Sequence, residues 1–530
     1  MEPGKALTIL AAAALLLLGC SRSDEARGPV LNRGNGPDIK SLDPAFVQGT
    51  WEGFVVGDMI VGLTTEGPRG EPIPGAATHW ETSPDGLVWT FHLRDHLWSD
   101  GVPVTAADFV TAWRRLLDPN TAAPYAYNLW VVKNARAISA GRLPPSALGI
   151  RATDDKTLVV TLEHPASYLP ELMDHQVAWP IPRHAYLKYG EAWSRVKNYV
   201  GNGPYIVTEW LPGDHVTLVK NPLFYDAAHV RIQTVNYLQT SDANAGLRQF
   251  RAGQLDTLYQ FPIFQIDWMR AHIASELRSA PYLGVAYFAM NFTRKPLRDA
   301  RLRQALNLAL DREVLTGKLH RIGETPAYRI VPPGVADYPG AAALWFAALP
   351  PARRIARAQE LMRAMGYGPG RLLKLGYLTS VNPDSQRNAA AFQAMMAKIY
   401  IDIDIEAVEG QVFQQMVQRR DFDIAFPSWI ADFNDASNFL DLLRTGSGEN
   451  YGGYANPAYD ALLDAADATP DPKARAAKML AAERLALSDY AWVPAYFLVT
   501  HDLVQPYVKG WIANPRNINR TRWLWLDKRG

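Results

Sequence analysis

Apolar side chains recur at every second position in two stretches of the chain. Residues 87–93 alternate after a turn at residues 84–86, and residues 401–408 (IDIDIEAV) alternate without a break. A period of two places successive side chains on opposite faces of a strand. We therefore predict a strand over each stretch, and a further strand over residues 422–426. One face of this last strand would carry Phe422, Ile424 and Phe426.

Other stretches repeat their apolar side chains every three or four residues, the spacing of one helix face. The clearest follows Thr105, a favourable N-cap with Asp108 three residues later, which together predict the start of a helix. Three more helices are predicted over residues 299–319, 389–400 and 411–420.

The last predicted helix lies between two predicted strands, so residues 401–426 form a β-α-β passage. This alternation is typical of an α/β fold, here with mixed sheets. No linker rich in Pro, Ser or Gly interrupts residues 39–530. That length suggests roughly two to four domains. Domains without linkers indicate a chain that crosses between them more than once, and such domains enclose clefts with hinged walls.

The N-terminus has the features of a signal segment. Lys5 precedes an apolar run over residues 6–18, which is shorter than the roughly 20 residues that span a bilayer. Cys20 follows in the sequence LLGC, which resembles a bacterial lipoprotein cleavage box with an acylated cysteine. We therefore predict a lipoprotein signal peptide over residues 1–20 with lipid attachment at Cys20. The polar residues 21–38 are predicted to form a flexible tether.

Composition and missing motifs narrow the function. The 54 basic and 53 acidic residues give a net charge of +1, and no basic tract stands out, which argues against a nucleic-acid partner. Cys20 is the only cysteine, so internal disulfides, cysteine nucleophiles and thiolate metal sites are excluded. The motifs G-x-S-x-G, G-x-x-x-x-G-K and G-x-G-x-x-G are missing. We expect a protein that is not an enzyme and has no cofactor and no metal.

Two groups of side chains were weighed against this expectation. His92 and His96 are four residues apart, but on a predicted strand this spacing corresponds to about 13 Å, which disfavours a metal pair. Asp432, Asp435 and Asp441 offer carboxylates of the kind that glycosidases use in pairs. Because Asp435 is explained more simply as the cap of the following helix, a carboxylate-dependent hydrolase is the least favoured function.

Asp432 is the most unusual of these residues. It lies in the apolar run of residues 424–433 (IAFPSWIADF), which contains no lysine, arginine or histidine. A carboxylate in apolar surroundings is costly unless a positive group meets it. The sequence therefore raises the question of which cation Asp432 binds.

Several stretches together resemble the family-5 extracellular solute-binding proteins of bacterial oligopeptide ABC importers, most closely the oligopeptide-binding and murein-peptide-binding members. They follow the order of the family and span nearly all of the mature chain. These stretches are SLDP (41–44), TFHLRDHLWSDGVPVTAADFVTAWRRLLDPNTAAPYA (90–126), DDKTLVVTL (154–162), GNGPY (201–205), AMNFTRKPLRDARLRQALNLALDRE (289–313) and WIADFNDASNFL (429–440).

The resemblance implies a bilobal periplasmic-binding-protein-like fold of the large type, with an extra inserted domain and a ligand cleft between the domains. A peptide would lie extended in the cleft as an added strand, with its side chains in water-lined pockets. The implied divisions are lobe I over residues 39–60, 183–283 and 500–530, the inserted domain II over 61–182, and lobe III over 284–499.

The resemblance also implies roles for single residues. In the family, the aspartate of W-x-A-D pairs with the α-ammonium group of the peptide, and Asp432 occupies that position. A free α-amine has a pKa of about 7.7–8.0 and is largely protonated at neutral pH. Trp429 would wall a side-chain pocket and Tyr125 would face the ligand, although both could be ordinary core aromatics. The other implied ligand contacts are Gln48 and Thr50 from lobe I, the backbone of Leu283 and Gly284, and Phe426.

The chain departs from the family where the carboxylate end of the ligand would lie. Members that accept peptides of several lengths have basic residues just before W-x-A-D, whereas this chain has Phe426 and Pro427. Gln48 stands where a glutamate can occur in the family. Arg387 and Arg420 are the remaining candidates for binding the carboxylate, and the preferred peptide length stays open.

The combined prediction is a monomeric lipoprotein anchored at the periplasmic or extracytoplasmic face of a membrane. It would deliver oligopeptides to an ABC permease and its ATPase subunits. The alternatives within the same fold are a murein tripeptide, a dipeptide, a nickel chelate or an oligosaccharide as the ligand. Asp432 favours a ligand that carries an amine over a plain sugar.

Overall fold

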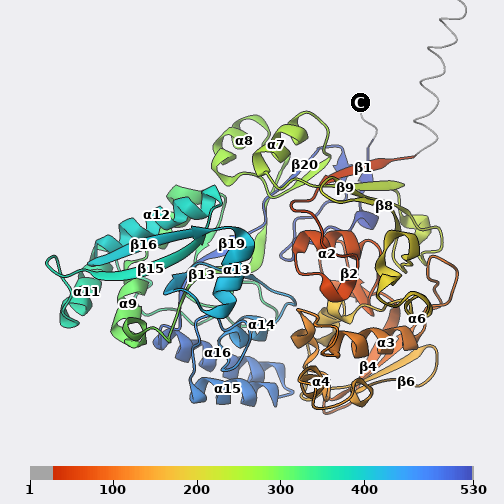
Figure 1. The fold of residues 1–530 in the computed structure, drawn as a ribbon, viewed down its shortest axis with the longest axis horizontal. Helices are drawn as coiled ribbons and strands as arrows, with labels where there is room; N and C mark the ends of the chain where they lie inside the picture. The colour runs from red at the N-terminus through yellow and green to blue at the C-terminus, as the bar shows by residue number, and fades with distance from the viewer. Residues whose placement is uncertain (1–27, 528–530) are drawn as a thin grey trace, which may run out of the picture.

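The computed structural model describes residues 28–527, and its strands form three large sheets (Figure 1). The first sheet combines strands from the beginning, the middle and the end of the chain. Its order is β12-β20-β11-β1-β10-β9-β8. The bounds are β1 Val30–Gly34, β8 Tyr205–Leu211, β9 His215–Lys220, β10 Thr234–Leu238, β11 Thr257–Tyr259, β12 Leu277–Arg278 and β20 Asp502–Val504.

The second sheet is mixed and lies within the predicted lobe III and its border with lobe I. Its order is β14-β19-β13-β17-β15-β16, and β18 pairs separately with β13. The parallel pairs are β15 with β16 and β15 with β17. The bounds are β13 Pro281–Met290, β14 Thr325–Pro326, β15 Leu373–Ser380, β16 Ile401–Val408, β17 Ile424–Ala425, β18 Ser428–Ile430 and β19 Trp492–Val499.

The third sheet is antiparallel, with the order β4-β5-β7-β6, and belongs to the predicted domain II. Its strands are β4 Ala77–Thr82, β5 Val88–Leu93, β6 Ile150–Ala152 and β7 Thr157–Thr161. Two short pairs complete the strands: β2 Thr64–Glu66 with β3 Pro72–Pro74, and β21 Val508–Lys509 with β22 Trp525–Leu526.

Helices surround these sheets (Figure 1). Those of lobe I and domain II are α2 Thr50–Gly57, α3 Ala106–Leu117, α4 Ala135–Ser139, α5 Leu169–Leu172, α6 Arg183–Tyr189, α7 Ala243–Arg251 and α8 Ile266–His272. Those of lobe III are α9 Ala300–Ala309, α10 Arg312–Val314, α11 Pro351–Ala364, α12 Pro383–Ala397, α13 Gly410–Arg419, α14 Ser437–Leu440, α15 Pro457–Asp467 and α16 Pro472–Ser488. None of the helices between residues 28 and 527 is long and apolar enough to cross a membrane.

Most of the elements predicted from the apolar pattern are present. The strands at 87–93 and 401–408 correspond to β5 and β16, and the helix after Thr105 is α3. The predicted capping box is formed, because the Thr105 N–H donates to Asp108 Oδ2 at 2.8 Å. The helix predicted over 389–400 ends at Ala397, and Tyr400 has a positive φ of 66°, which a helix cannot accommodate.

Two predicted elements are interrupted. The periodic stretch at 299–319 breaks after Ala309, and a short helix and a π-helical turn follow. The strand predicted over 422–426 is reduced to the two residues of β17. Pro427 follows closely and has no N–H to donate to the sheet, so the chain resumes pairing only at β18.

The prediction of a flexible tether over residues 21–38 is wrong for its second half. Val30–Gly34 forms β1, which lies between β10 and β11 and pairs in parallel with both. Leu31 is fully buried, and the buried Arg33 donates from Nη1 to Thr521 Oγ1 at 2.9 Å. The polar composition was misleading because one apolar side chain and long-range pairing are enough to hold a central strand. Residues 21–27 lie outside the described residues.

The buried core has two main parts. One apolar cluster lies within residues 283–497, and the other combines side chains of lobe I and domain II. Phe433 of lobe III packs into the second cluster, with its ring stacked on Tyr168 at 4.7 Å. The fold class predicted from the sequence is confirmed, and the exact lobe boundaries at residues 60, 182, 283 and 499 remain our proposal.

A buried ion pair fixes the segment that follows β18. Arg475 on α16 donates from Nη1 and Nη2 to Asp435, at 2.7 and 2.9 Å, and both side chains are buried. Removing one partner of such a pair leaves an uncompensated charge. We therefore expect Arg475→Met to lower the free energy of unfolding by about 3–5 kcal/mol, measured by urea denaturation.

The control is Arg301→Met, which removes an exposed pair with Asp299 and should change stability by less than about 1 kcal/mol. Adding Asp435→Asn to Arg475→Met should recover much of the loss, because the buried charge is then gone. Equal effects of Arg475→Met and Arg301→Met would contradict this assignment.

Candidate ligand-binding cleft

Asp432 lies just beyond the end of β18, at a cavity of about 280 Å³. Strand β18 pairs with β13 so that Trp429 is opposite Val285, and the Ala431 N–H donates to the Leu283 carbonyl at 2.8 Å. The chain leaves the sheet at this point and turns the Asp432 side chain toward the cavity. Only 12% of this side chain is exposed.

Two asparagines position Asp432. Asn128 of domain II donates from Nδ2 to Asp432 Oδ2 at 3.1 Å, which joins domain II to lobe III across the cleft. Asn438 accepts at Oδ1 from the Asp432 N–H at 3.1 Å and from Trp429 Nε1 at 2.8 Å. One amide side chain therefore binds both the backbone of Asp432 and the indole of Trp429.

The carboxylate has no cationic partner of its own. Among residues 28–527, its ion-pair contact is with His175, whose Nε2 lies 3.7 Å from Asp432 Oδ1. Burial, and then the positive charge of Arg516, lower the pKa of His175 to about 3, so this imidazole is neutral at neutral pH. Burial raises the pKa of Asp432 to about 6, although the hydrogen bonds from the asparagines oppose this shift.

The two arginines that line the same cavity are already paired with acids. Arg516 binds Asp174 through both terminal nitrogens, at 2.6 and 2.7 Å. Arg520 donates from Nε to Glu66 Oε2 at 3.0 Å and forms a second contact with the same carboxylate. The fixed cations of the cavity are thus neutralised, and Asp432 is left in excess.

Gln48, Thr50, Tyr125 and Trp429 line this cavity together with Asp432, as the sequence predicts. The loop that carries Gln48 is fixed by the buried Glu52, which accepts the Gln48 N–H at 2.9 Å. Burial, and then the charge of Asp432, raise the pKa of Tyr125 well above its usual range. Its hydroxyl therefore stays protonated and can donate a hydrogen bond.

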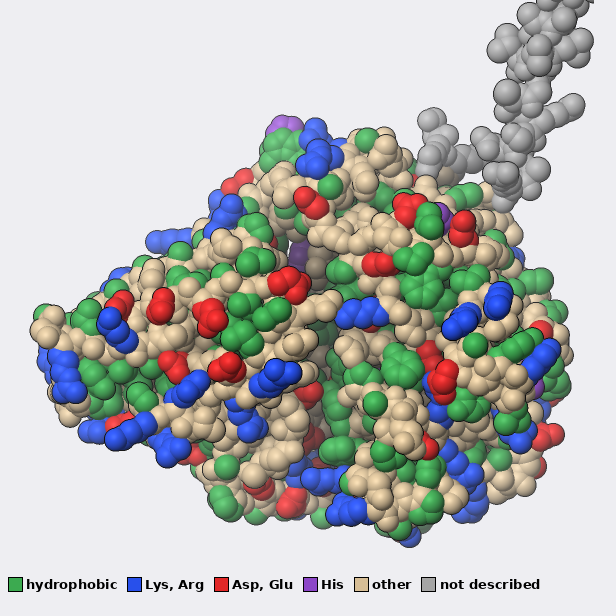
Figure 2. Space-filling view, in the orientation of Figure 1, with side chains coloured by type: hydrophobic (Ala, Val, Ile, Leu, Met, Phe, Trp, Pro, Cys, Tyr) green, Lys and Arg blue, Asp and Glu red, His purple; other side chains and the backbone are tan. Residues whose placement is uncertain are grey.

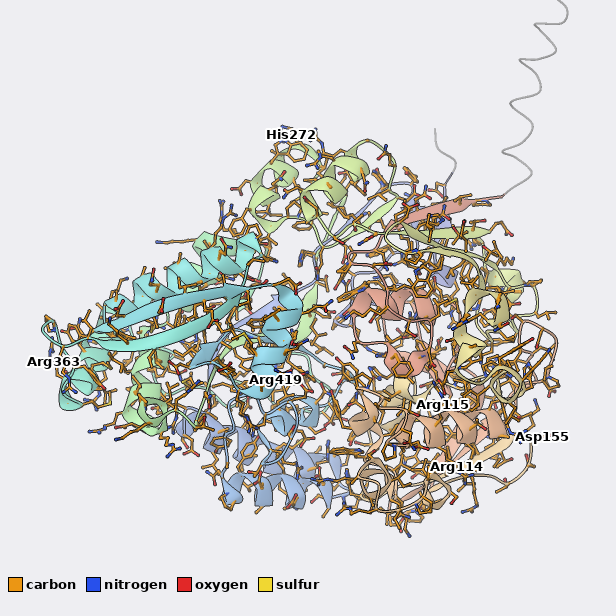
Figure 3. All side chains as sticks on the ribbon, in the orientation of Figure 1. Arg114, Arg115, Asp155, His272, Arg363 and Arg419 are labelled. Carbon is orange, nitrogen blue, oxygen red and sulfur yellow. The ribbon has the colours of Figure 1, made fainter. Side chains whose placement is uncertain are left out.

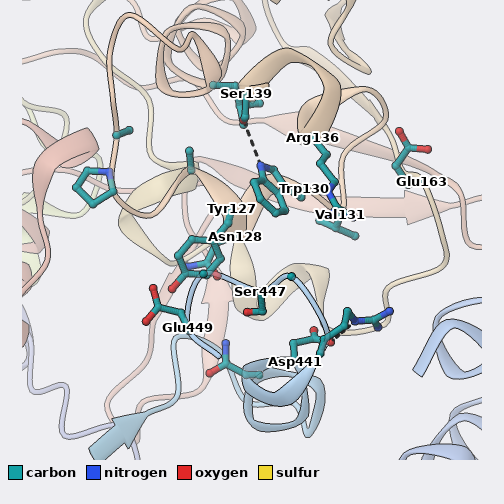
Figure 4. A pocket seen from close by; sticks show the side chains of 18 of the residues that line it. Tyr127, Asn128, Trp130, Val131, Arg136, Ser139, Glu163, Asp441, Ser447 and Glu449 are labelled. Carbon is teal, nitrogen blue, oxygen red and sulfur yellow. Dashed lines mark hydrogen bonds and ion pairs between the residues drawn. The ribbon is translucent and has the colours of Figure 1, made fainter. Parts of the chain in front are cut away.

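A larger cavity of about 840 Å³ lies between domain II and lobe III (Figure 4). Trp429 lines both cavities, and Asn128, which contacts Asp432, lines the larger one. The space-filling view shows the surface hollowed between lobe III and the rest of the molecule (Figure 2). The cleft therefore continues from the smaller cavity at Asp432, past Trp429, into the larger cavity.

Glu449 provides a second carboxylate in the larger cavity, near Tyr127 and Asn128 (Figure 4). It accepts a hydrogen bond from the Tyr451 hydroxyl, and no Lys, Arg or His of the described chain lies within ion-pair distance of it. Burial raises the pKa of Glu449 above its usual range. The buried hydroxyl of Tyr127 has no hydrogen-bond partner among the described residues.

Three residues implied by the resemblance lie outside both cavities. Leu283 uses its N–H for the Pro515 carbonyl and its own carbonyl for the Ala431 N–H, so its backbone is already satisfied. Gly284 lies opposite Ile430 in the ladder, where an added Cβ would approach Leu498 Cδ1 to 2.7 Å. Phe426 packs against Phe288 in the core of lobe III. The direct ligand contacts of these three residues therefore stay a prediction, without support from the two cavities.

The two arginines considered for the carboxylate end are also engaged elsewhere. Arg387 lies over the ring of Phe264 at 3.8 Å, and Arg420 donates to the Asn450 carbonyl at 3.0 Å. Arg419 is the last residue of α13 (Figure 3). None of them lines the described cavities. Cys20 lies outside the described residues.

The alternative of a carboxylate-dependent hydrolase finds no support in this arrangement. Asp435 binds Arg475 and caps the following turn by accepting the Ser437 N–H at 2.9 Å. Asp441 binds Arg444. Because both neighbours of Asp432 serve the fold, no second free carboxylate from this segment faces the smaller cavity.

The sequence did not point to several residues of the cleft. His175, Asn128, Asn438 and Arg516 come from stretches far apart in the chain, and each is an ordinary residue in its local pattern. One local signal was available for Asn438, which follows Asp432 by six residues in the quoted motif. The others acquire their role only when domain II and the C-terminal segment meet lobe III.

Comparison with known proteins agrees with this fold and cleft. The family model of bacterial extracellular solute-binding proteins, family 5, matches residues 71–451. The chain is 35% identical over 490 residues to the periplasmic oligopeptide-binding protein of Salmonella typhimurium, covering 91% of this chain and 89% of that protein. It is 33% identical to the periplasmic murein peptide-binding protein of Escherichia coli, covering 92% and 91%.

A solved structure extends the likeness to three dimensions. The oligopeptide-binding protein OppA of Haemophilus influenzae, in complex with the peptide RPPGFSPFR, superposes with a TM-score of 0.86 at 34% identity. The match covers 94% of this chain and 99% of that one.

The raised pKa of Asp432 has a consequence for stability. The folded pKa of about 6 exceeds the ordinary value of 3.8, so the folded state binds the proton more tightly than the unfolded state. Ionisation of Asp432 therefore destabilises the ligand-free protein as pH rises through this interval. We expect Asp432→Asn to be more stable than the wild type at pH 7–8, where Asp432 is ionised.

Below pH 4 the two proteins should be equally stable, because the carboxyl is then protonated. Urea denaturation over this pH range measures the difference. A constant difference at every pH would mean that Asp432 is not held in the buried, uncompensated state described above.

Proposed function

Because the chain belongs to the family-5 bacterial extracellular solute-binding proteins, we propose that it binds oligopeptides by their free N-terminus and delivers them to an ABC permease and its ATPases. Like its relatives, it is a binding protein of ABC import and not an enzyme. The peptide would lie extended between lobe I, domain II and lobe III. The proposal rests above all on Asp432, a buried carboxylate without a cationic partner among residues 28–527.

An α-ammonium group fits this environment chemically. It would supply the positive charge that neither His175 nor the paired arginines can give to Asp432. The smaller cavity also offers the hydroxyl of Tyr125 and the polar side chains of Gln48 and Thr50. A buried, hydrogen-bonded charge pair of this kind is most favourable when each partner is satisfied.

The location of the protein follows from the same family. It acts at the periplasmic or extracytoplasmic side of the membrane, where its relatives bind their ligands. We further propose that Cys20 is acylated and anchors the chain as a lipoprotein, and that the protein works as a monomer. The sequence LLGC before the mature chain supports the anchor.

Dipeptides and murein tripeptides remain alternatives, because they too can present an amine to Asp432. The similarity to a murein peptide-binding protein supports the murein tripeptide as an alternative. A plain oligosaccharide lacks the amine that Asp432 needs, whereas a nickel chelate stays an alternative. Native mass spectrometry of the protein purified from its host would identify the bound ligand.

We expect Asp432→Ala to weaken the binding of a tri- or tetrapeptide by about tens- to thousands-fold, equivalent to roughly 2–5 kcal/mol. The loss follows because the buried ammonium group would no longer have a partner. Isothermal titration calorimetry measures the affinity. Asp421→Ala is the matched control, since this aspartate is 70% exposed and should leave the affinity unchanged.

N-acetylation of the peptide should have the same effect on the wild type and little further effect on Asp432→Ala. Independent losses from the two changes would show that Asp432 and the peptide N-terminus do not meet. Full peptide affinity in Asp432→Ala would reject the proposal for this residue.

We also propose that the first side chain of the peptide enters the larger cavity and that Glu449 favours a basic one. Trp429 lines both cavities, and Glu449 has no cationic partner among the described residues. The wild type should therefore bind a peptide that begins with lysine about tenfold or more tightly than one that begins with norleucine. Glu449→Gln should abolish that preference, measured by calorimetry.

Glu163→Gln is the control, because Glu163 lines the same cavity but is exposed and accepts the Asn134 N–H. An unchanged preference in Glu449→Gln would exclude this role for Glu449. It would leave the assignment of Asp432 intact, because the acetylated peptide tests that assignment separately.

A further inference from the structure

We propose that the outer face of the sheet in domain II binds one divalent transition-metal ion through His79, Glu81 and His92. Neither cavity of the cleft includes these residues. The sequence prediction of no metal considered His92 only with His96, which is buried near Asn202. Strand pairing instead brings His92 next to a histidine 13 positions earlier in the chain.

The strand register brings the three side chains to one face. His79 on β4 is directly opposite His92 on β5, and Glu81 follows two residues later on the same face. The imidazole rings are stacked with their centroids 4.4 Å apart and their planes 11° apart. The next pair along the strands, Trp80 and Phe91, points to the other face, and the centroids of these two rings are 6.1 Å apart.

The ligand atoms converge closely enough for one ion. His92 Nε2 lies 3.9 Å from Glu81 Oε1, and one ligand atom from each residue lies within 4.8 Å of the other two. Nitrogen and oxygen ligands at about 2.0–2.2 Å from a central ion are separated by roughly 3–4 Å. Binding one ion would require rotation of these side chains, of which His79 and Glu81 are exposed and His92 is half-buried.

A neighbouring threonine sets the tautomer that a metal ligand requires. Thr78 lies at an irregularity in the β4–β5 register, and its hydroxyl donates to the His92 carbonyl at 3.2 Å. Thr78 Oγ1 also lies 2.9 Å from His79 Nδ1 and can accept from it while its own proton goes to the His92 carbonyl. In that arrangement the proton of His79 is on Nδ1, and Nε2 carries the free lone pair.

A metal-binding histidine commonly donates its second ring N–H to a nearby oxygen in this way, which fixes both the tautomer and the ring orientation. The register irregularity at Thr78 thus prepares His79 as a ligand. Such irregularities often redirect side chains at functional positions of a sheet.

The donor set selects the chemical class of the ion. Two imidazoles and one carboxylate suit Zn²⁺, Ni²⁺ or Cu²⁺, whereas Ca²⁺ and Mg²⁺ prefer oxygen ligands alone. Water would complete the coordination, because the site is open to solvent. Strand β4 is at the edge of its sheet, so the ion would also tie this edge strand to β5.

The experiment is calorimetric titration of the full-length, metal-free protein with Zn²⁺. We expect one site that weakens by about tenfold or more in His79→Ala and in His92→Ala, and less in Glu81→Gln. His272→Ala is the matched control, since this exposed histidine is stacked on Trp268, outside the proposed site. It should leave Zn²⁺ binding unchanged.

Two further readouts separate metal binding from a folding defect. Electron paramagnetic resonance of the Cu²⁺-loaded wild type should show two imidazole nitrogens, and one in either histidine variant. Thermal unfolding in a chelator should be the same for all variants, while Zn²⁺ should raise the midpoint of the wild type and of His272→Ala and leave both other histidine variants nearly unshifted. Zn²⁺ affinity that is unchanged in both histidine variants, or a wild type that binds no Zn²⁺, would overturn the proposal.

Discussion

The architecture of the cleft depends on one carboxylate that the protein buries without neutralising it. In the part of the chain that the structure describes, both arginines that line the cavity of Asp432 are already paired with acids: Arg516 with Asp174, and Arg520 with Glu66. His175 approaches the carboxylate but is kept neutral by burial and by Arg516. A single unpaired arginine in this cavity would cancel the charge of Asp432 and remove the basis for attracting a ligand cation.

This arrangement requires a chain that crosses between domains. Asp174, Glu66 and His175 belong to domain II, Arg516 and Arg520 to the C-terminal segment, and Asp432 to lobe III. Each residue is placed by different elements, so the electrostatic pattern exists only when the three bodies meet. The ion pairs of the cavity thus help to join lobe I to domain II. They leave Asp432 of lobe III as the carboxylate that a ligand could pair with under the proposed function.

The sequence predicted the parts of this design that are local. Alternation identified β5 and β16, the Thr105–Asp108 box identified α3, and the apolar run around Asp432 identified the unusual charge. It could not identify Asn128 or Arg516, because their roles depend on contacts with residues about 80 or more positions away. Nor could the sequence show that the backbone of Leu283 pairs with Pro515 and Ala431, because these contacts form only in the fold.

The contact between Asn128 and Asp432 connects the burial of this charge with the closing of the cleft between domain II and lobe III. Asn128 satisfies one oxygen of the carboxylate with a neutral donor, which stabilises the approach of domain II to lobe III without neutralising the charge. A ligand shifts such an equilibrium only by its different affinity for the two arrangements. An ammonium group gains most where water is excluded, since Coulomb attraction grows as the local dielectric falls. Under the proposed function, a cationic ligand terminus would therefore favour the closed cleft, and the uncompensated charge of Asp432 would make that preference strong.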